Sequence, residues 1–326
     1  MGNGALKTFL GVDGGGSKTE FLLIDAQGTI LGRHQEGSAY YLEIGLDPLR
    51  ALLARGIQAT CAQADVAAPD FAFFGIPAYG EDSQLLATFD ALPCPPLARD
   101  RVRCGNDMVC GWAGALAGRD GINIVAGTGS IAYGEFNGRQ ARAGGWGELF
   151  SDEGSAYWIA HEGLALFSRM SDGRAPRGPL YEILRTHFSL SSDLDICAAI
   201  FGADQAWRSR VAALAPLVAQ AARAADALAV EIFTRAAQEL AAIVVATRRN
   251  LGVPDEIAIP VSYSGGMFRL TDLILDPLRS ELLCARSLWE FTPPRLSPGA
   301  GAALYAAKCN GTPLDEAAIV RLEQGM

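Results

Sequence analysis

Two strand–turn–strand segments of the same design constrain this chain more than any other feature. Residues 7–13 and 20–25 have the pattern of buried strands, and the turn between them reads GGGSKT. Residues 122–126 and 131–136 repeat the pattern around the turn GTGS. Two such hairpins about 115 residues apart predict an internally duplicated α/β architecture in which both turns face one ligand.

The first turn has the composition of an anion-binding loop. Glycines let backbone N–H groups approach an anion closely, Ser17 and Thr19 add hydroxyl groups, and Lys18 adds a positive charge. The alternative is an ordinary flexible hairpin. The turn is neither a Walker loop nor a dinucleotide fingerprint, because GxxxxGK[ST] is absent and a strand follows where those motifs need a helix.

Two aspartates end strands beside these features. Asp13 directly precedes the glycines and could hold Mg²⁺ through water, although a turn aspartate is the alternative. Asp107 stands between a strand and a helix, where an aspartate commonly caps the helix. A carboxylate fixed at a helix start could also accept a proton, so the two roles of Asp107 are compatible.

The remaining pattern completes two mixed α/β halves. The first half should contain a third strand at 29–32, a strand at 71–75 with a loop at 77–80, a strand at 101–104, and helices at 45–64, 83–91 and 108–118. The second should contain a third strand at 140–143, a strand at 256–261, and helices at 151–170, 176–188, 193–200, 205–250, 268–280 and about 297–308. Pro216 should break or kink the longest helix.

Composition narrows the class of protein. At 326 residues the chain suits two domains, and hydrophobic residues, at 50%, suffice for packed cores. A net charge of -9 disfavours binding to nucleic acid or to an anionic membrane. The seven cysteines form no CxxC pair, so we expect reduced thiols rather than zinc or iron–sulfur ligands. No signal-peptide pattern or long uncharged apolar run is present, which predicts a cytoplasmic protein.

Five motifs in order resemble the actin-like ATPase-domain superfamily of sugar kinases, hexokinases and heat-shock chaperones. Residues 13–19 look like its first phosphate loop, 127–130 like its second and 264–268 like its adenosine loop. Residues 144–147 (GGWG) and 151–161 (SDEGSAYWIAH), with Asn106-Asp107, resemble the N-acetylglucosamine kinases within the family named for the benzoyl-CoA reductase activating ATPases.

The resemblance implies an α/β fold of two ribonuclease-H-like lobes, each a mixed central sheet with helices, and a nucleotide cleft between them. The lobes would be 1–118 and 119–326, and the resemblance leaves open that the last helix, about 297–308, returns to the N-terminal lobe. The cofactors would be ATP and Mg²⁺, the partner a small amino sugar, and a homodimer is a weak expectation by analogy.

The resemblance also assigns residues. Asp107 would be the general base on the sugar 6-hydroxyl, and Asp13 would orient Mg²⁺ through water. ATP would be bound by Gly14, Gly15, Gly16, Ser17, Lys18, Thr19, Thr128, Gly129, Ser264, Gly265, Gly266 and Met267. The sugar would contact Tyr40, Asp107, Ser130, Gly145, Trp146, Gly147, Asp152 and Glu153.

The chain departs from the family pattern at two loops. Tyr40 takes the place of a usual Asn, and residues 75–80 (GIPAYG) replace a Gly-x-Ser-Gly type sequence. Tyr40 and Tyr79 could therefore narrow the sugar pocket or accept a different substituent. Three alternatives to N-acetylglucosamine phosphorylation stay open: a kinase of glucosamine or another amino sugar, an ATPase that activates a reductase through an iron–sulfur cluster, and a sugar sensor without activity.

Overall fold

The computed structural model describes residues 6–16, 18–201 and 207–326. Its strands are β1 (Thr8–Gly14), β2 (Thr19–Asp25), β3 (Ile30–Glu36), β4 (Phe71–Ile76), β5 (Val102–Asn106), β6 (Gly121–Ala126), β7 (Ser130–Phe136), β8 (Arg139–Gly144), β9 (Ile259–Ser264) and β10 (Trp289–Phe291).

The α-helices are α1 (Tyr41–Ile44), α2 (Leu46–Gln63), α3 (Leu86–Ala91), α4 (Met108–Leu116), α5 (Ala156–Ser171), α6 (Pro179–Phe188), α7 (Asp195–Phe201), α8 (Trp207–Ala212), α9 (Ala215–Arg223), α10 (Ala227–Leu251), α11 (Asp276–Cys284), α12 (Pro298–Cys309) and α13 (Glu316–Gln324). Short 3₁₀ or π turns are η1 (Ser83–Leu85), η2 (Arg99–Arg101), η3 (Gly266–Arg269) and η4 (Thr271–Leu275).

The strands form two five-stranded sheets with the same internal order. The first runs β3-β2-β1-β4-β5 and the second, read from its other edge, runs β8-β7-β6-β9-β10. β1 and β2, β2 and β3, and β7 and β8 pair antiparallel, whereas β1 and β4, β4 and β5, and β9 and β10 pair parallel. The duplication expected from the two hairpins therefore extends to the whole strand order.

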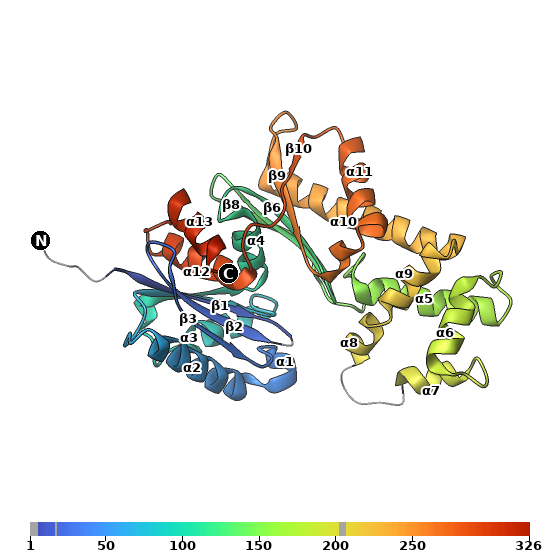
Figure 1. Cartoon of the computed structure of the whole chain (residues 1–326), viewed down its shortest axis with the longest axis horizontal. Helices are drawn as coiled ribbons and strands as arrows, with labels where there is room; N and C mark the ends of the chain where they lie inside the picture. Colours follow the sequence, from blue (N-terminus) through green and yellow to red (C-terminus); the bar gives the residue numbers. More distant parts are fainter. Residues whose placement is uncertain (1–5, 17, 202–206) are drawn as a thin grey trace, which may run out of the picture. The chain divides into compact units, whose positions relative to one another are not determined.

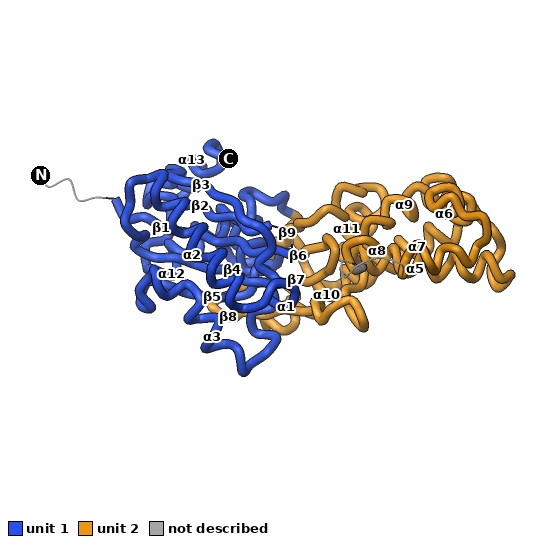
Figure 2. Tube along the Cα trace, turned by 90° about the horizontal axis from the view of Figure 1, so that it is seen from below, with its two compact units in different colours: residues 1–123, 292–326 blue, residues 124–291 orange. Residues whose placement is uncertain are grey.

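The chain divides into two compact units, coloured separately in Figure 2. The first unit contains residues 1–123 and 292–326, and the second contains 124–291. These bounds differ from the expected lobes at the C-terminal end, because α12 packs against β1 and α4 of the first unit. The structure thus places the small-residue helix with the first unit.

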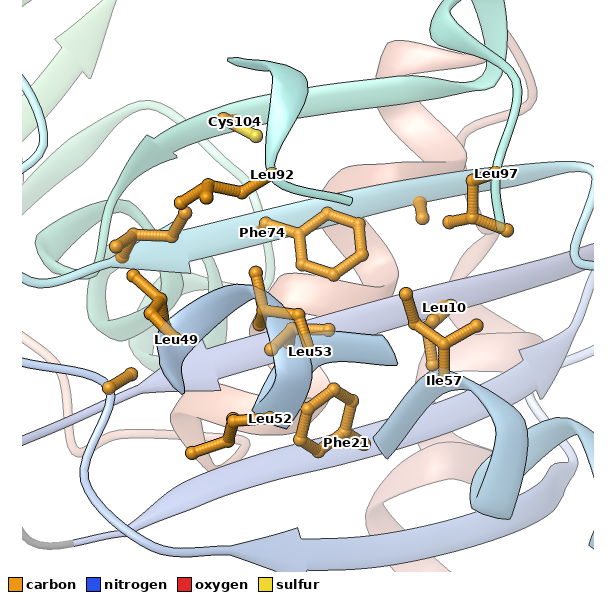
Figure 3. Packing of buried hydrophobic residues seen from close by; sticks show 14 of the residues in the cluster. Leu10, Phe21, Leu49, Leu52, Leu53, Ile57, Phe74, Leu92, Leu97 and Cys104 are labelled. Carbon is orange, nitrogen blue, oxygen red and sulfur yellow. The ribbon is translucent and has the colours of Figure 1, made fainter. Parts of the chain in front are cut away.

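Each face of the first sheet is covered by helices (Figure 1). On one face, Leu49, Leu53 and Ile57 of α2 pack with Leu10 and Phe74 in one buried cluster (Figure 3). Burying such side chains contributes roughly 1.5–3 kcal/mol each.

On the other face of this sheet, glycine allows close packing of α12. A Cβ on Gly11 of β1 would lie 2.0 Å from the backbone nitrogen of Ala303. A Cβ on Gly301 would lie 2.1 Å from the backbone nitrogen of Gly114 in α4. The small residues after Ser297 are therefore required where α12 meets the sheet and α4.

Helices in the second unit differ from three expectations. The helix expected at 151–170 begins at Ala156, because Ser155 caps it and accepts a hydrogen bond from Trp158 N. The helix expected at 205–250 is three helices, with Pro216 in the first turn of α9 and a second break before Asp226, which caps α10. The helix expected at 268–280 is η3, η4 and α11 in succession.

The sequence pattern did not predict three short elements, and two strands have other bounds than predicted. The expected third strand at 29–32 continues to Glu36, and the strand expected at 256–261 spans Ile259–Ser264. The structure adds α1, β10 and α13, for which the pattern gave no prediction. None of the helices in residues 6–16, 18–201 and 207–326 combines the length and the apolarity that crossing a membrane requires.

Candidate functional site

The first glycine turn joins β1 to β2 and is held by backbone hydrogen bonds. Gly15 N donates to Lys18 O at 2.9 Å, and Gly15 O accepts from Ala39 N at 3.0 Å. Gly16 and Lys18 are exposed, and a Cβ on Gly16 would meet open space. The turn therefore leaves an exposed glycine backbone and a lysine at the end of the hairpin, as an anion-binding loop requires.

The structure does not show Thr19 or Ser17, two predicted phosphate ligands, with a hydroxyl group available to a phosphate. The Thr19 side chain is fully buried, and its hydroxyl donates to Gly37 O at 2.8 Å. Thr19 thus ties the turn to the segment after β3 rather than presenting its hydroxyl outward. Ser17 lies outside the described residues.

Asp13 and Asp107 lie at the same edge of the first sheet. Asp13 pairs with Gly75 of β4, and Asp107 follows β5, the next strand. A Cβ on Gly75 would lie 2.2 Å from Cys110 Sγ and 3.1 Å from Asp107 Cα, so glycine lets the start of α4 approach β4. Open α/β sheets place ligands at this carboxyl end of their parallel strands.

The carboxyl group of Asp13 has a strongly raised pKa. Burial, followed by the negative charges of Asp107 and Glu20, raises the pKa of Asp13 to about 8, although a hydrogen bond from Cys110 and the charge of Lys18 act the other way. Burial also raises the pKa of the Cys110 thiol well above its usual value. The carboxylates of this cluster outnumber its nearby cations, which are Lys18 and an Arg33 whose Nε lies 3.8 Å from Glu20 Oε1, so a bound metal cation would stabilise the ionised cluster.

These donors fit a hydrated divalent cation better than a cage of protein ligands. No group of three or more His, Cys, Asp or Glu side chains in the described parts of the chain is arranged to hold a metal ion. Mg²⁺ commonly binds through one or two carboxylates, several waters and substrate phosphates. Asp13 beside a glycine turn matches that pattern.

Asp107 occupies the N-cap position of α4 without acting as its cap. Within the described residues its side chain makes no capping hydrogen bond. Asn106 performs this role, because its Oδ1 accepts from Met108 N at 3.1 Å while its Nδ2 donates to Tyr79 O at 3.2 Å. The capping alternative for Asp107 is therefore wrong, because Asn106 provides the cap of α4.

The two tyrosines that depart from the family pattern differ in their surroundings. The Tyr79 ring lies 5.7 Å from Phe89, and its hydroxyl donates to Asp90 Oδ1 at 2.9 Å. Burial and this hydrogen bond raise the pKa of Tyr79 to about 12. Tyr40 is half-buried before α1, and its N–H donates to Ser38 Oγ at 3.1 Å. The Tyr79 side chain is thus used in packing its own loop, whereas Tyr40 stands beside the first turn.

The second glycine turn is joined to the start of α5. Gly127 N donates to Gly129 O at 2.9 Å, which closes the turn between β6 and β7. Gly127 O accepts from Ala156 N at 2.8 Å, and Thr128 O accepts from Tyr157 N at 3.3 Å. The exposed Thr128 side chain therefore lies on a turn whose carbonyl groups bind the first N–H groups of a helix.

The acidic loop before α5 is ordered by the same turn. The buried Ser130 donates its hydroxyl to Glu153 O at 2.7 Å, and Ser151 Oγ donates to Glu153 Oε2 at 3.2 Å. Asp152 is 2% exposed and has a left-handed backbone, with φ of 60°. Such strain in a non-glycine residue is common at functional sites. Ser151, Asp152 and Glu153 thus form a fixed loop, and their expected place in the first helical turn is wrong.

The glycine-tryptophan loop follows β8. Gly144, Gly145 and Gly147 all have positive φ, and Gly145 O accepts from Arg142 Nη2 at 2.8 Å. The Trp146 ring is 69% exposed and lies 5.7 Å from the Arg142 guanidinium. An exposed tryptophan on a glycine-rich loop offers a flat face to a sugar ring.

The third glycine turn follows β9. A Cβ on Gly265, which has φ of 106°, would lie 2.3 Å from Ala126 O at the end of β6. Gly266 borders open space, and Met267 is buried in η3. Gly265 therefore brings the third turn close to the end of β6, the strand that leads into the second glycine turn.

The structure thus brings the expected residues together in two sets, one in each unit. The first unit groups Asp13, Gly14, Gly15, Lys18 and Asp107. The second groups the turn at 127–130, the acidic loop and the turn at 264–266.

The sequence analysis did not identify three residues that interact with the predicted site residues. Glu20 and Cys110 act on the charge of Asp13, and Arg208 of α8 binds Asp152. Glu20 and Cys110 could have been found from their spacing to Asp13 and Asp107. Arg208 lies in an alanine-rich helical stretch without a motif.

A model of the BadF/BadG/BcrA/BcrD ATPase family matches residues 10–306. The N-acetyl-D-glucosamine kinase of Dictyostelium discoideum is 27% identical over 91% of this chain and 97% of its own length. The N-acetylmuramic acid/N-acetylglucosamine kinase of Clostridium acetobutylicum is 26% identical over 85% of this chain and 90% of its own length.

A solved structure of a candidate N-acetylglucosamine kinase from Chromobacterium violaceum is similar to this chain. It superposes with a TM-score of 0.71 and 26% identity, covering 92% of this chain and 99% of that one. Its agreement with the two mixed sheets confirms the expected fold of two ribonuclease-H-like halves.

Proposed function

Because the chain belongs to the BadF/BadG/BcrA/BcrD ATPase family, we propose that it is an ATP-dependent amino-sugar kinase. It transfers the γ-phosphoryl group of ATP to the 6-hydroxyl of N-acetylglucosamine. The family match agrees with the expected ATP use, and the related proteins from two organisms are kinases of this sugar by name. The observation that carries the proposal is the Asp107 carboxylate, which stands at the start of α4 while Asn106 caps the helix.

In this reaction the chain's own groups bind, orient and remove a proton. Asp107 takes the proton of the sugar 6-hydroxyl, a role that contributes roughly 10²–10⁴-fold. The exposed glycine backbone of the first turn, Lys18 and Thr128 bind ATP phosphates, and Gly265 with Gly266 bind the adenosine. Trp146, Asp152 and Glu153 orient the sugar, with Tyr40 and Ser130 beside them.

Mg²⁺ belongs to the proposed site through Asp13. When bound, it would neutralise charge on the β- and γ-phosphates. The raised pKa of Asp13 and the nearby Asp107 and Glu20 carboxylates support a cation at this position.

The larger organisation stays a prediction in three respects. The two compact units correspond in our proposal to the two lobes of the kinase, with α12 belonging to the first. A homodimer and a cytoplasmic location remain expectations from analogy and from sequence. Neither affects the roles assigned to Asp107 and Asp152.

Two other functions have their own tests. A glucosamine kinase would prefer the free amine in a steady-state comparison with N-acetylglucosamine. An activator ATPase would carry iron after anaerobic purification and would turn over ATP without sugar.

Phosphorus NMR of the product with an Asp107→Asn variant tests the proposal. Wild-type protein with Mg-ATP and N-acetylglucosamine should give the 6-phosphate. Asp107→Asn should lower kcat by about 10²-fold or more with its fold retained, because Asn106 still caps α4. The exposed Asp100→Asn serves as the matched control and should behave as wild type. A near-wild-type kcat for folded Asp107→Asn would show that the base is another group.

A further inference from the structure

Arg208 links the acidic loop to the helical part of the second unit. It lies on α8, which packs against α5. Its Nη2 lies 2.8 Å from Asp152 Oδ2, and its Nε lies 3.1 Å from Glu148 Oε2. The Arg208 side chain is 34% exposed, whereas that of Asp152 is 3% exposed, so the ion pair joins a partly exposed guanidinium to a buried carboxylate.

Asp152 needs such a partner because it is buried. Burial, together with the negative charge of Glu148, raises the pKa of Asp152, and the charge and hydrogen bond of Arg208 oppose this effect. The Asp152 carboxylate also accepts a hydrogen bond from the backbone N–H of Ser130. Arg208 is therefore the cation that favours the ionised form of Asp152.

The same ion pair touches the second glycine turn. A Cβ on Gly129 would lie 2.6 Å from Asp152 Oδ2 and 2.8 Å from Arg208 Nη2. Ser130, the next residue, binds the acidic loop through Glu153 O. A shift of Arg208 would thus move Asp152 against the turn that is proposed to bind phosphate.

We propose that Arg208 is a positioning residue for sugar recognition: by pairing with Glu148 and Asp152, it holds Asp152 in the orientation in which this carboxylate accepts hydrogen bonds from the hydroxyl groups of a neutral amino sugar. The inference rests on the proposed function, since it assumes that Asp152 contacts the sugar. Arg208 acts through the two carboxylates and removes no proton in the reaction. Without the guanidinium, the carboxylates of Glu148 and the buried Asp152 would no longer have Arg208 between them. The Asp152 side chain would then move away from Glu148 or take up a proton.

Calorimetric titration of N-acetylglucosamine into Arg208→Met, Arg208→Lys and Arg210→Met tests this role. Arg210 is the matched control, because it lies on the same helix and donates to Ala199 O at 2.9 Å. Arg208→Met should raise the Kd for the sugar by about tenfold or more, and Arg208→Lys should recover part of the loss. Arg210→Met should bind as wild type, and KM for ATP should change less than about twofold in all three variants.

A second readout separates positioning from a purely structural role. Removing Arg208 should move the acid-side loss of sugar binding to higher pH, because Arg208 lowers the pKa of Asp152 against burial and Glu148. Thermal unfolding of each variant, measured alongside, shows whether the fold is retained. If Arg208→Met misfolds, Arg208→Lys carries the test through the same Kd and pH profile.

The outcomes distinguish the inference from the function on which it rests. A folded Arg208→Met with unchanged sugar affinity and pH profile would overturn the inference and leave the kinase proposal intact. Equal losses for sugar and ATP would also overturn it, because they would indicate a general disturbance of the unit. A wild-type protein that binds no amino sugar would overturn the proposed function, and the inference with it.

Discussion

At the scale of single residues, the proposed site contains carboxylates whose neighbours determine their charge. Asp13 and Asp152 are both held where burial opposes ionisation, but only Asp152 has an arginine beside it. Asp13 instead faces Asp107 and Glu20. The excess of carboxylates around Asp13 is therefore suited to binding a metal cation, whereas Asp152 is already paired with the cationic side chain of Arg208.

The raised pKa of Asp13 predicts a pH-dependent stability. Between its ordinary pKa of 3.8 and the folded value of about 8, the folded protein keeps a proton that the unfolded chain has released. The contribution of Asp13 to the free energy of unfolding therefore decreases as pH rises through this window. Asp13→Asn removes the titration, so its Tm relative to wild type should increase from about pH 5 to about pH 8.5 without metal or nucleotide.

The exposed Asp100→Asn is the control for this measurement and should show a constant difference from wild type. A pH-independent difference for Asp13→Asn, measured in EDTA, would mean that Asp13 is not held in the neutral form by its surroundings.

Several of these residues could be predicted, and others could not. Asp13 directly precedes a glycine-rich turn, and Asp107 and Asp152 stand near the predicted starts of helices, so the local pattern marks them. The Asn106 side chain that caps α4 also donates to Tyr79 O, a residue 27 positions away that the local pattern does not connect with it. Arg208 is separated from Asp152 by 56 positions and has no periodic or motif signal.

At the scale of elements, glycine turns fix how strands end and helices begin. Gly265 is the clearest case, because its φ is 106° and a Cβ would meet Ala126 O at 2.3 Å. Gly266, its neighbour, borders open space and has no positive φ. Only the first of these two adjacent positions requires glycine, so the same substitution at the second provides a matched control.

Gly265→Ala should lower the free energy of unfolding by about 1–3 kcal/mol, through backbone strain and displacement of β9 from β6. Gly266→Ala should change it by less than about 0.5 kcal/mol. Urea unfolding measures both, and fluorescence titration with an ATP analogue should show weaker binding for Gly265→Ala. Equal stability of the two variants would argue against the close approach of the third turn to β6.

The predicted bounds of helices were wrong where irregular backbone interrupts a helical pattern. Residues 151–153 have the acidic composition of a helix start, but positive φ at Asp152 and Gly154 delays α5 until Ser155 caps it. β10 has three residues, too few for a periodic signal, and is defined by its pairing with β9. Long apolar strands and α2 were predicted well because their periodicity is sustained.

At the scale of the whole molecule, the repeated strand order is the main finding. The two hairpins predicted a duplication, and the structure extends it to all strands of both sheets. The sequence left open whether the helix at about 297–308 returns to the first lobe, and the structure places residues 292–326 in the first unit through the packing of α12 against β1 and α4.

Metal dependence is a property of the whole enzyme. EDTA should abolish phosphoryl transfer, and Mg²⁺ should restore it, because the nucleotide and Asp13 would share the cation. Asp13→Asn should need about tenfold more Mg²⁺ for half-maximal rate. Full activity in EDTA, or an unchanged Mg²⁺ requirement in Asp13→Asn, would contradict the role of this carboxylate.

Coupled ADP release with Mg-ATP and a panel of sugars would test whether this chain is an N-acetylglucosamine kinase. The panel contains N-acetylglucosamine, glucosamine, N-acetylmuramic acid, glucose and a sample without sugar. We expect ADP release that depends on N-acetylglucosamine and is near background without sugar. Rapid release without sugar, or none with any member of the panel, would contradict the assignment of this chain as an N-acetylglucosamine kinase.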